Sequence, residues 1–194
     1  MANSRVHLDH LIKRQSIRYF SQSEEDDISG RTFADNNDNK LRYSDLIGEW
    51  ITRIRKPDFQ RETNAWTPKD CKDFLDTAVY GKIIPSIILW LNKENGLVYV
   101  LDGAHRLSVL RAWMLDDWGD KAGIYYQRRD MNAIKQAATE TRSIIQESVG
   151  LFEDYKQADS EYRRIADEGR APKTEMSENS FLISAYNVSL RSQV

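Results

Sequence analysis

The chain has 194 residues, 40% of them hydrophobic and one a cysteine, so it can bury a core without disulfide bonds or a cysteine-based zinc site. The sequence contains 28 Lys and Arg residues and 30 Asp and Glu residues, and the resulting net charge of −2 neither favours nor excludes nucleic-acid binding. The sequence shows no apolar run typical of a signal peptide or a membrane span, so we expect a cytoplasmic protein that does not contact a membrane.

Residues 1–40 form an N-terminal segment whose second half, residues 21–40, is polar and acidic and predicts a mobile loop. Glu24 to Asp27 make up its acidic cluster. His7 and His10 lie three positions apart, a spacing compatible with a metal ion on one helix face. Because no third ligand is in view, we interpret the two histidines as part of a solvated face.

Leu46, Ile47, Trp50, Ile51 and Ile54 recur at helical spacing, which predicts a helix that ends before Pro57. Basic residues are concentrated at and after its end, and they are candidates for contact with DNA phosphates: Arg53, Arg55 and Lys56.

Thr67, Pro68 and Asp70 together predict a helix start, with an N-cap, a proline in the first turn and an acidic residue near the positive end of the dipole. Cys71 falls on the apolar face of this helix, so we interpret it as a core residue and not as a nucleophile. Gly81 stands where a left-handed cap would end the helix.

Two short β-prone runs, 86–91 and 97–101, are separated by a turn-forming stretch and predict a hairpin. The second run leads through Asp102 and Gly103 into a helical pattern that reaches about Leu115. Helical patterns follow after Asp130 and around Phe152 to Ile165, with a last segment from Phe181 to Leu190. We therefore predict an α+β fold with a small sheet, a core over residues 41–126 and a helical extension over residues 127–194.

The junction between strand and helix at residues 102–106 is the strongest candidate for chemistry. The first N–H groups of such a helix are unpaired and attract phosphate. Gly103 allows close approach, Asp102 can cap the helix or hold a metal-bound water, Arg106 can bind phosphate oxygens, and His105 can titrate near neutral pH. Asp-Gly is also a common turn pair, and Arg106 could simply form a surface ion pair with Asp102 or Glu62.

Three motifs support a family resemblance: Pro57-Asp58-Phe59-Gln60-Arg61 ahead of Trp66, Gly81-Lys82-Ile83-Ile84-Pro85, and Asp102-Gly103-Ala104-His105-Arg106. Their order and spacing resemble the N-terminal domain of the GmrSD type IV restriction enzymes, in which an Asp-Gly-Gln-Gln-Arg signature follows a Gln-Arg and a Gly-x-x-Ile-Pro motif. Ala104 and His105 stand where the family usually has two glutamines.

The resemblance implies a ParB/sulfiredoxin-like fold, binding and possibly hydrolysis of a nucleoside triphosphate with Mg²⁺, and a role in DNA restriction or phage defence. It implies a catalytic role for Asp102, which would also lie nearest the metal. His105 departs from the family and is a catalytic candidate through its own chemistry, because an imidazole that faces the γ-phosphate can accept a proton. The implied phosphate-binding residues are Gly103, Ala104, Arg106, Gln60 and Arg61. We interpret Trp66 as a residue that packs under the following helix and not as a base-stacking one.

Sulfiredoxin chemistry is excluded, because Ala104 stands where sulfiredoxins have their cysteine. An HNH nuclease site is not expected from only three histidines, so DNA cleavage would need a nuclease partner. The alternative function is a DNA-binding regulator or adaptor of the ParB-like class. A third interpretation is an interaction module or homo-oligomer, whose helical tail packs on another subunit through Tyr155, Tyr162, Phe181 and Tyr186.

Overall fold

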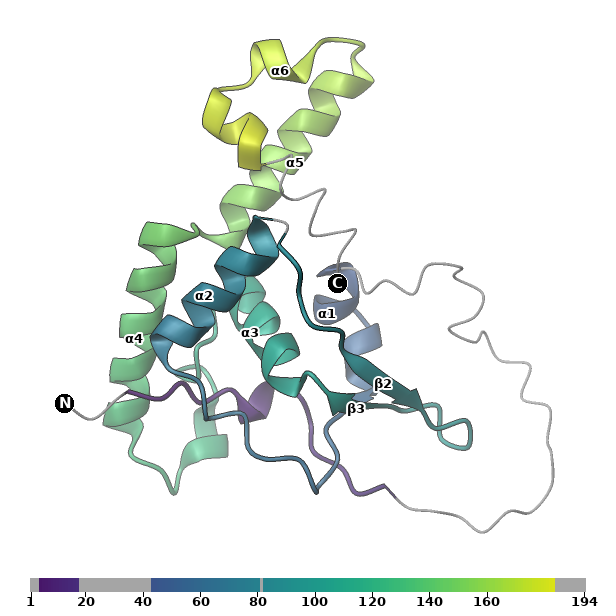
Figure 1. The fold of residues 1–194 in the computed structure, drawn as a ribbon, viewed down its shortest axis with the longest axis vertical. Helices are drawn as coiled ribbons and strands as arrows, with labels where there is room; N and C mark the ends of the chain where they lie inside the picture. Colours follow the sequence, from purple (N-terminus) through teal and green to yellow (C-terminus); the bar gives the residue numbers. More distant parts are fainter. Residues whose placement is uncertain (1–3, 18–42, 81, 184–194) are drawn as a thin grey trace.

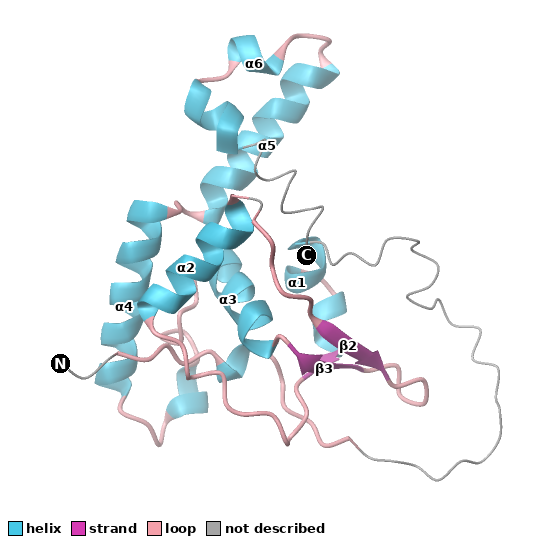
Figure 2. Cartoon of the chain, in the orientation of Figure 1, coloured by secondary structure: helices cyan, strands magenta, loops and turns pink. Residues whose placement is uncertain are grey.

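The computed structural model describes residues 4–17, 43–80 and 82–183, and it confirms an α+β fold with a small mixed sheet. Figure 1 shows the helices around and beyond this sheet, and Figure 2 separates helices from strands by colour. The elements in chain order are η1 (Asp9–Leu11), α1 (Tyr43–Ile47), η3 (Trp50–Arg53), β1 (Ile54–Arg55), α2 (Pro68–Val79), β2 (Ile88–Leu91), β3 (Val98–Asp102), α3 (Ala104–Leu115), η4 (Gly123–Tyr126), α4 (Met131–Ser148), α5 (Phe152–Asp167) and α6 (Pro172–Glu175). Residues 178–183 are also helical. Assignment to the ParB/sulfiredoxin superfamily stays a prediction.

The sheet has the strand order β1-β3-β2. The predicted hairpin is confirmed, because β2 and β3 pair antiparallel, while β1 pairs parallel with β3 only at Val98 and Tyr99. The register between β2 and β3 shifts after the Leu89–Val100 pair, so Leu101 lies in a bulge just before Asp102. The end of β3 that leads to Asp102 therefore extends beyond its pairing with β1.

The helix predicted to end before Pro57 is wrong in its second half. α1 stops at Ile47, a short 3-10 turn follows, and Ile54 lies in β1, where it pairs with Val98. Proline disfavours helical geometry in the residue before it, and the β-branched Ile54 fits a strand well. A neighbouring strand thus decided the conformation of a segment whose apolar spacing is typical of a helix.

Helix α2 begins as predicted from its local sequence. The Thr67 side chain accepts a hydrogen bond from the Asp70 N–H, and the Asp70 carboxylate accepts one from the Thr67 N–H in return. The Cys71 prediction is also confirmed, because the thiol is fully buried and burial raises its pKa to about 12. Gly81, the predicted cap, lies outside the described residues.

One hydrophobic core joins three parts of the chain. Val6 and Leu8 from the N-terminus pack with Leu75 of α2 and Leu107 of α3, and with Tyr155 at the start of α5. The predicted division into residues 1–40, 41–126 and 127–194 stays a prediction, although buried side chains from all three ranges meet in this core. In the described part of the chain, no helix is long and apolar enough to cross a membrane.

Helices α5 and α6 extend from the rest of the molecule (Figure 1). Ala158, Ile165 and Met176 form a second, small buried cluster there, with Tyr162 and Phe181 packed against it. Tyr162 and Phe181 are thus partly buried by their own chain, as an ordinary core would predict. Tyr186 lies outside the described residues, and assembly through this tail stays a prediction.

Candidate functional site

Strand β3 turns directly into helix α3 through Gly103, as the sequence predicts. Gly103 has a φ of 93°, in the left-handed region that favours glycine. A Cβ atom at this position would lie 2.9 Å from Cγ1 of Ile87. Glycine is therefore required both by its backbone conformation and by the side chain that lies against it.

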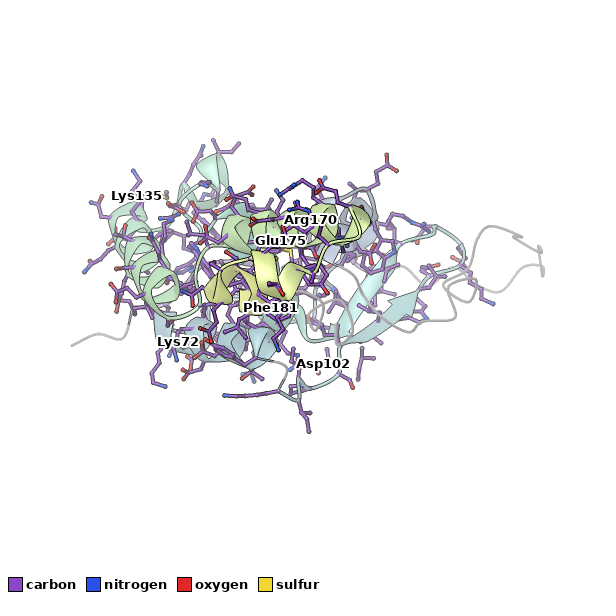
Figure 3. The ribbon with its side chains drawn as sticks, turned by 90° about the horizontal axis from the view of Figure 1, so that it is seen from above. Lys72, Asp102, Lys135, Arg170, Glu175 and Phe181 are labelled. Atoms are coloured by element: carbon purple, nitrogen blue, oxygen red, sulfur yellow. The ribbon has the colours of Figure 1, made fainter. Side chains whose placement is uncertain are left out.

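No side chain caps the N-terminus of α3. The predicted capping role of Asp102 is wrong, because its carboxylate instead accepts a hydrogen bond from Arg106, with 2.6 Å between Oδ2 and Nη2. The same Arg106 nitrogen donates to the Ser86 carbonyl over 3.0 Å. The Asp102 side chain is 61% exposed, and Figure 3 shows it at the outer edge of the molecule. An exposed carboxylate and a guanidinium thus flank an uncapped helix terminus.

His105 faces inward from the first turn of α3. Its ring stacks on Trp66 with 5.8 Å between centroids and 22° between planes, and Trp66 also packs against Phe74 of α2. The prediction that Trp66 packs under helix α2 is thus confirmed. Burial, followed by the charge of Lys56, lowers the pKa of His105 below its usual value. Within the described residues, His105 Nε2 and Arg106 Nε are buried without a hydrogen-bond partner.

Gln60 lies against the end of β3. Its amide nitrogen donates to the carbonyl oxygens of Val100 and Leu101, at 2.6 and 2.7 Å. These are the two residues before Asp102, in the part of β3 that β1 no longer covers. Arg61 is exposed, and no hydrogen bond or ion pair among the described residues joins it to Arg106. Its place in a common phosphate site stays a prediction.

The basic residues proposed for DNA contact do not form one free surface. Lys56 is fully buried, and its ammonium donates to the Asp9 carboxylate and, at 2.7 Å, to Thr63 Oγ1. The prediction that Lys56 contacts DNA is therefore wrong. The guanidinium groups of Arg53 and Arg55 do reach solvent, but they also donate to neighbouring groups, including the Gly96 carbonyl and the Gln15 side chain.

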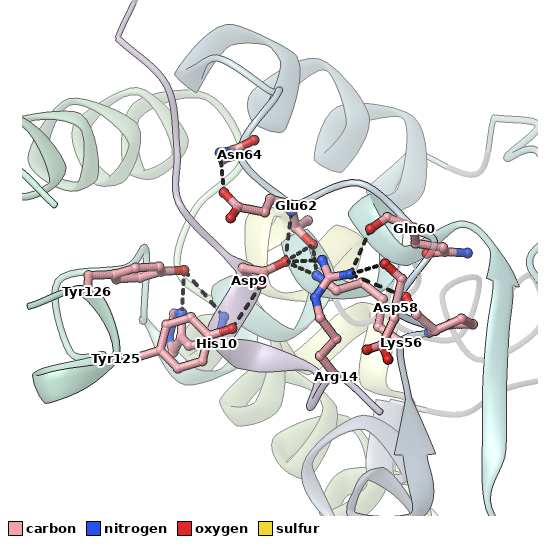
Figure 4. A network of polar contacts seen from close by, with 12 residues as sticks. Asp9, His10, Arg14, Lys56, Asp58, Gln60, Glu62, Asn64, Tyr125 and Tyr126 are labelled. Carbon is pink, nitrogen blue, oxygen red and sulfur yellow. Dashed lines mark hydrogen bonds and ion pairs between the residues drawn. The ribbon is translucent and has the colours of Figure 1, made fainter. Parts of the chain in front are cut away.

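Asp9 is the centre of a buried polar cluster that the sequence did not reveal (Figure 4). It accepts hydrogen bonds from Lys56, from the Thr63 N–H at 3.0 Å, from Tyr125 Oη at 2.9 Å and from Arg14 at 3.3 Å. Burial alone would raise the pKa of Asp9, but these hydrogen bonds and the nearby ammonium outweigh it and lower the pKa to about 2. Neither spacing nor residue type distinguishes Asp9 from other acidic residues in the sequence.

His7 and His10 are not on a solvated face, so that interpretation is wrong. The His10 ring contacts Asp117 Oδ2 at 2.8 Å through Nε2 and Tyr126 Oη at 3.2 Å through Nδ1. His7 packs edge-on against the Tyr126 ring. No cluster of three or more His, Cys, Asp or Glu side chains that could hold a metal ion occurs in the described ranges.

A comparison with protein families identifies the family of this chain. The family described as the GmrSD restriction endonuclease N-terminal domain matches residues 43–191. No curated protein and no solved structure matches the chain. The family match spans the sheet, the Asp102–Arg106 turn and the helices that follow, which is more than half of the chain. The chain therefore belongs to the family of GmrSD restriction endonuclease N-terminal domains.

Proposed function

We propose that this chain is the nucleotide-binding module of a DNA restriction or phage-defence system, and that the Asp102–Arg106 turn binds the phosphates. One observation carries the proposal. The uncapped N-terminus of α3 follows a left-handed Gly103, and the residues before and after this start in the chain, Asp102 and Arg106, form an ion pair whose carboxylate is exposed. Backbone N–H groups at such a helix end, together with a planar cation, recognise phosphate oxygens.

The ion pair between Asp102 and Arg106 suggests how phosphate and a metal ion enter together. A phosphate group that takes over the Arg106 guanidinium would release the Asp102 carboxylate. That carboxylate is already exposed and could then bind Mg²⁺, which commonly uses one or two carboxylates and completes its shell with phosphate and water. A preformed cage of protein ligands is not needed for this arrangement.

Phe59 supports a nucleotide as the ligand in preference to free phosphate. Phe59 is 72% exposed, and it immediately precedes Gln60, whose amide is bonded to the Val100 and Leu101 carbonyls of β3. An exposed aromatic ring beside a phosphate site provides a stacking surface for a base. We propose that Phe59 contacts the base while Arg106 contacts the phosphates.

Hydrolysis is proposed only as a partner-dependent activity. A general base must reach the proton that it accepts, and the buried Nε2 of His105 does not face solvent. The stacking of His105 on Trp66 fits a role in supporting the turn. DNA cleavage would then come from a nuclease partner, with nucleotide binding as the contribution of this chain.

A nucleotide panel tests the proposal. Thermal unfolding is measured with ATP, GTP, CTP and UTP, each with and without Mg²⁺, for the wild type, Arg106→Ala and the control Arg53→Ala. A ligand that binds the native state raises apparent stability, by about 2.7 kcal/mol at a hundredfold excess over its dissociation constant. We expect at least one nucleotide to stabilise the wild type and Arg53→Ala but not Arg106→Ala. Absence of stabilisation of the wild type by every nucleotide, or an equal response of Arg106→Ala, would contradict the proposal.

A further inference from the structure

The N-terminal strap, defined here as residues 4–17, lies outside the range that the family model matches. It nevertheless pairs with the chain at Lys56, directly after β1. The Lys56 N–H donates to the Lys13 carbonyl over 2.9 Å, and the Gln15 N–H donates to the Lys56 carbonyl over 3.0 Å. These two bonds form a parallel bridge between Arg14 and Lys56. The strap is thereby held next to the loop that carries Gln60.

Arg14 binds that loop through its backbone. Its Nη1 atom lies 2.7 Å from the Gln60 carbonyl oxygen, 3.1 Å from that of Asp58 and 3.3 Å from that of Pro57 (Figure 4). Its Nη2 atom donates to Asp9, which is itself fixed by the buried cluster. A planar guanidinium can make both sets of bonds at once, because its donors point in fixed, diverging directions.

The loop that Arg14 holds is a turn whose last residue reaches the candidate site. The Gln60 N–H donates to the Pro57 carbonyl over 3.1 Å, which closes the turn. The Gln60 side chain then bonds to the Val100 and Leu101 carbonyls. These two carbonyls lie beyond the part of β3 that pairs with β1, and Leu101 lies in the bulge just before Asp102, so Gln60 contacts this end of the strand directly.

We propose that Arg14 is a positioning residue: it holds Gln60 against the end of β3 and so fixes the strand that carries Asp102 into the Asp102–Arg106 turn. The strap thereby becomes part of the binding apparatus although it lies outside the matched family region. The effect on ligand affinity rests on the proposed nucleotide function, whereas the placement of Gln60 by Arg14 does not.

Two readouts test the proposal in the full chain. The first is the pair of Gln60 side-chain NH₂ signals in a ¹H–¹⁵N correlation spectrum, assigned with Gln60→Ala. The second is the dissociation constant of the nucleotide that stabilises the wild type best. The variants are Arg14→Ala, Arg14→Lys and the control Arg5→Ala, whose guanidinium lies on the same strap and donates to the Ala65 carbonyl instead.

We expect both Arg14 variants to move the Gln60 signals toward those of a solvated amide, with Arg5→Ala unchanged. Lysine keeps a positive charge near Asp9 but cannot span three carbonyl groups, so Arg14→Lys tests the guanidinium even if Arg14→Ala fails to fold. We expect affinity to fall about tenfold, the equivalent of one charge-assisted hydrogen bond. We also expect Arg14→Lys to cause no further loss in a Gln60→Ala background, since the effect acts through Gln60.

Unchanged Gln60 signals in Arg14→Lys would overturn the placement of Gln60 by Arg14. Additive losses of affinity in the double variant would overturn its action through Gln60. If no nucleotide binds the wild type, the proposed function fails while the spectra still decide the placement of Gln60.

Discussion

Two clusters in this molecule contain the same kinds of side chain but in opposite surroundings. At the Asp102–Arg106 turn, the Asp102 side chain is 61% exposed and its pair with Arg106 stands beside an uncapped helix. In the Asp9 cluster, the Lys56 side chain is fully buried and Asp9 accepts several further hydrogen bonds. Burial and satisfied hydrogen bonding, and not residue type, therefore separate a structural ion pair from one that can exchange partners with a ligand.

The largest loss of stability is expected from the buried cluster. Asp9→Ala leaves the Lys56 ammonium buried with Thr63 Oγ1 as its remaining bonded partner among the described contacts. Removing one member of a buried ion pair typically costs about 3–5 kcal/mol in the free energy of unfolding. The control is Asp73→Ala, which removes an exposed carboxylate paired with Lys69 on α2. Urea unfolding should separate the two variants clearly, and similar stabilities would show that the Asp9 cluster is not structural.

The next largest effect is expected at Gly103, where the backbone of the exposed turn is most constrained. Gly103→Ala places a Cβ atom 2.9 Å from Ile87 Cγ1 and forces alanine into a left-handed conformation. We expect a loss of roughly 1–3 kcal/mol in urea unfolding. In an Ile87→Ala background, which lacks both Cγ atoms, the loss caused by Gly103→Ala should be recovered only in part, because the backbone strain remains. Full recovery would assign the whole effect to the contact with Ile87.

The pH dependence of stability should report His105, which belongs to the exposed turn but stacks inward on Trp66. Burial, followed by the charge of Lys56, lowers its pKa, so near pH 6.5 the unfolded chain binds more protons than the folded chain. Stability should therefore fall as the pH is lowered from about 7 to about 5. His105→Phe should reduce this loss of stability at low pH. Part of the pH dependence should remain in the variant, because burial also lowers the pKa of His7. An unchanged slope in urea unfolding would show that His105 is not buried in its neutral form.

The smallest effect on stability is expected from Arg106→Ala. The Arg106 side chain is 17% exposed, but its partner Asp102 is 61% exposed, and an ion pair that solvent reaches in this way typically contributes about 0–1 kcal/mol. The same variant should abolish nucleotide binding, so stability and affinity should separate at this residue. A loss of several kcal/mol in urea unfolding would instead show that Arg106 has a structural role, like the residues of the buried Asp9 cluster.

Local signals in the sequence predicted much of the fold. The Thr67 to Asp70 capping box marks the start of α2, and the Asp130 side chain accepts bonds from the first N–H groups of α4. The Asp102–Gly103 junction between strand and helix was predicted because it too is formed by neighbouring residues. Each of these features depends on contacts within a few positions along the chain.

The features that could not be predicted depend on distant partners. β1 has only two residues and exists because β3 lies beside it. Lys56 reads as a surface cation in the sequence, yet it pairs with Asp9, 47 positions away. Arg14 likewise contacts a turn more than 40 positions ahead of it. Nothing in residue spacing identifies such partners, because they become neighbours only when the core has formed.

The central claim is that ligand phosphates bind at the exposed turn and not elsewhere on the chain. Its most direct test is a ¹H–¹⁵N titration of the full chain with the stabilising nucleotide and Mg²⁺. We expect the largest shifts at the backbone N–H groups of Gly103, Ala104 and His105, smaller shifts at Gln60, and no shifts in the Asp9 cluster. If the largest shifts occurred on α5 and α6, or around Arg53 and Arg55 while the turn was unaffected, phosphate binding at the turn would be contradicted.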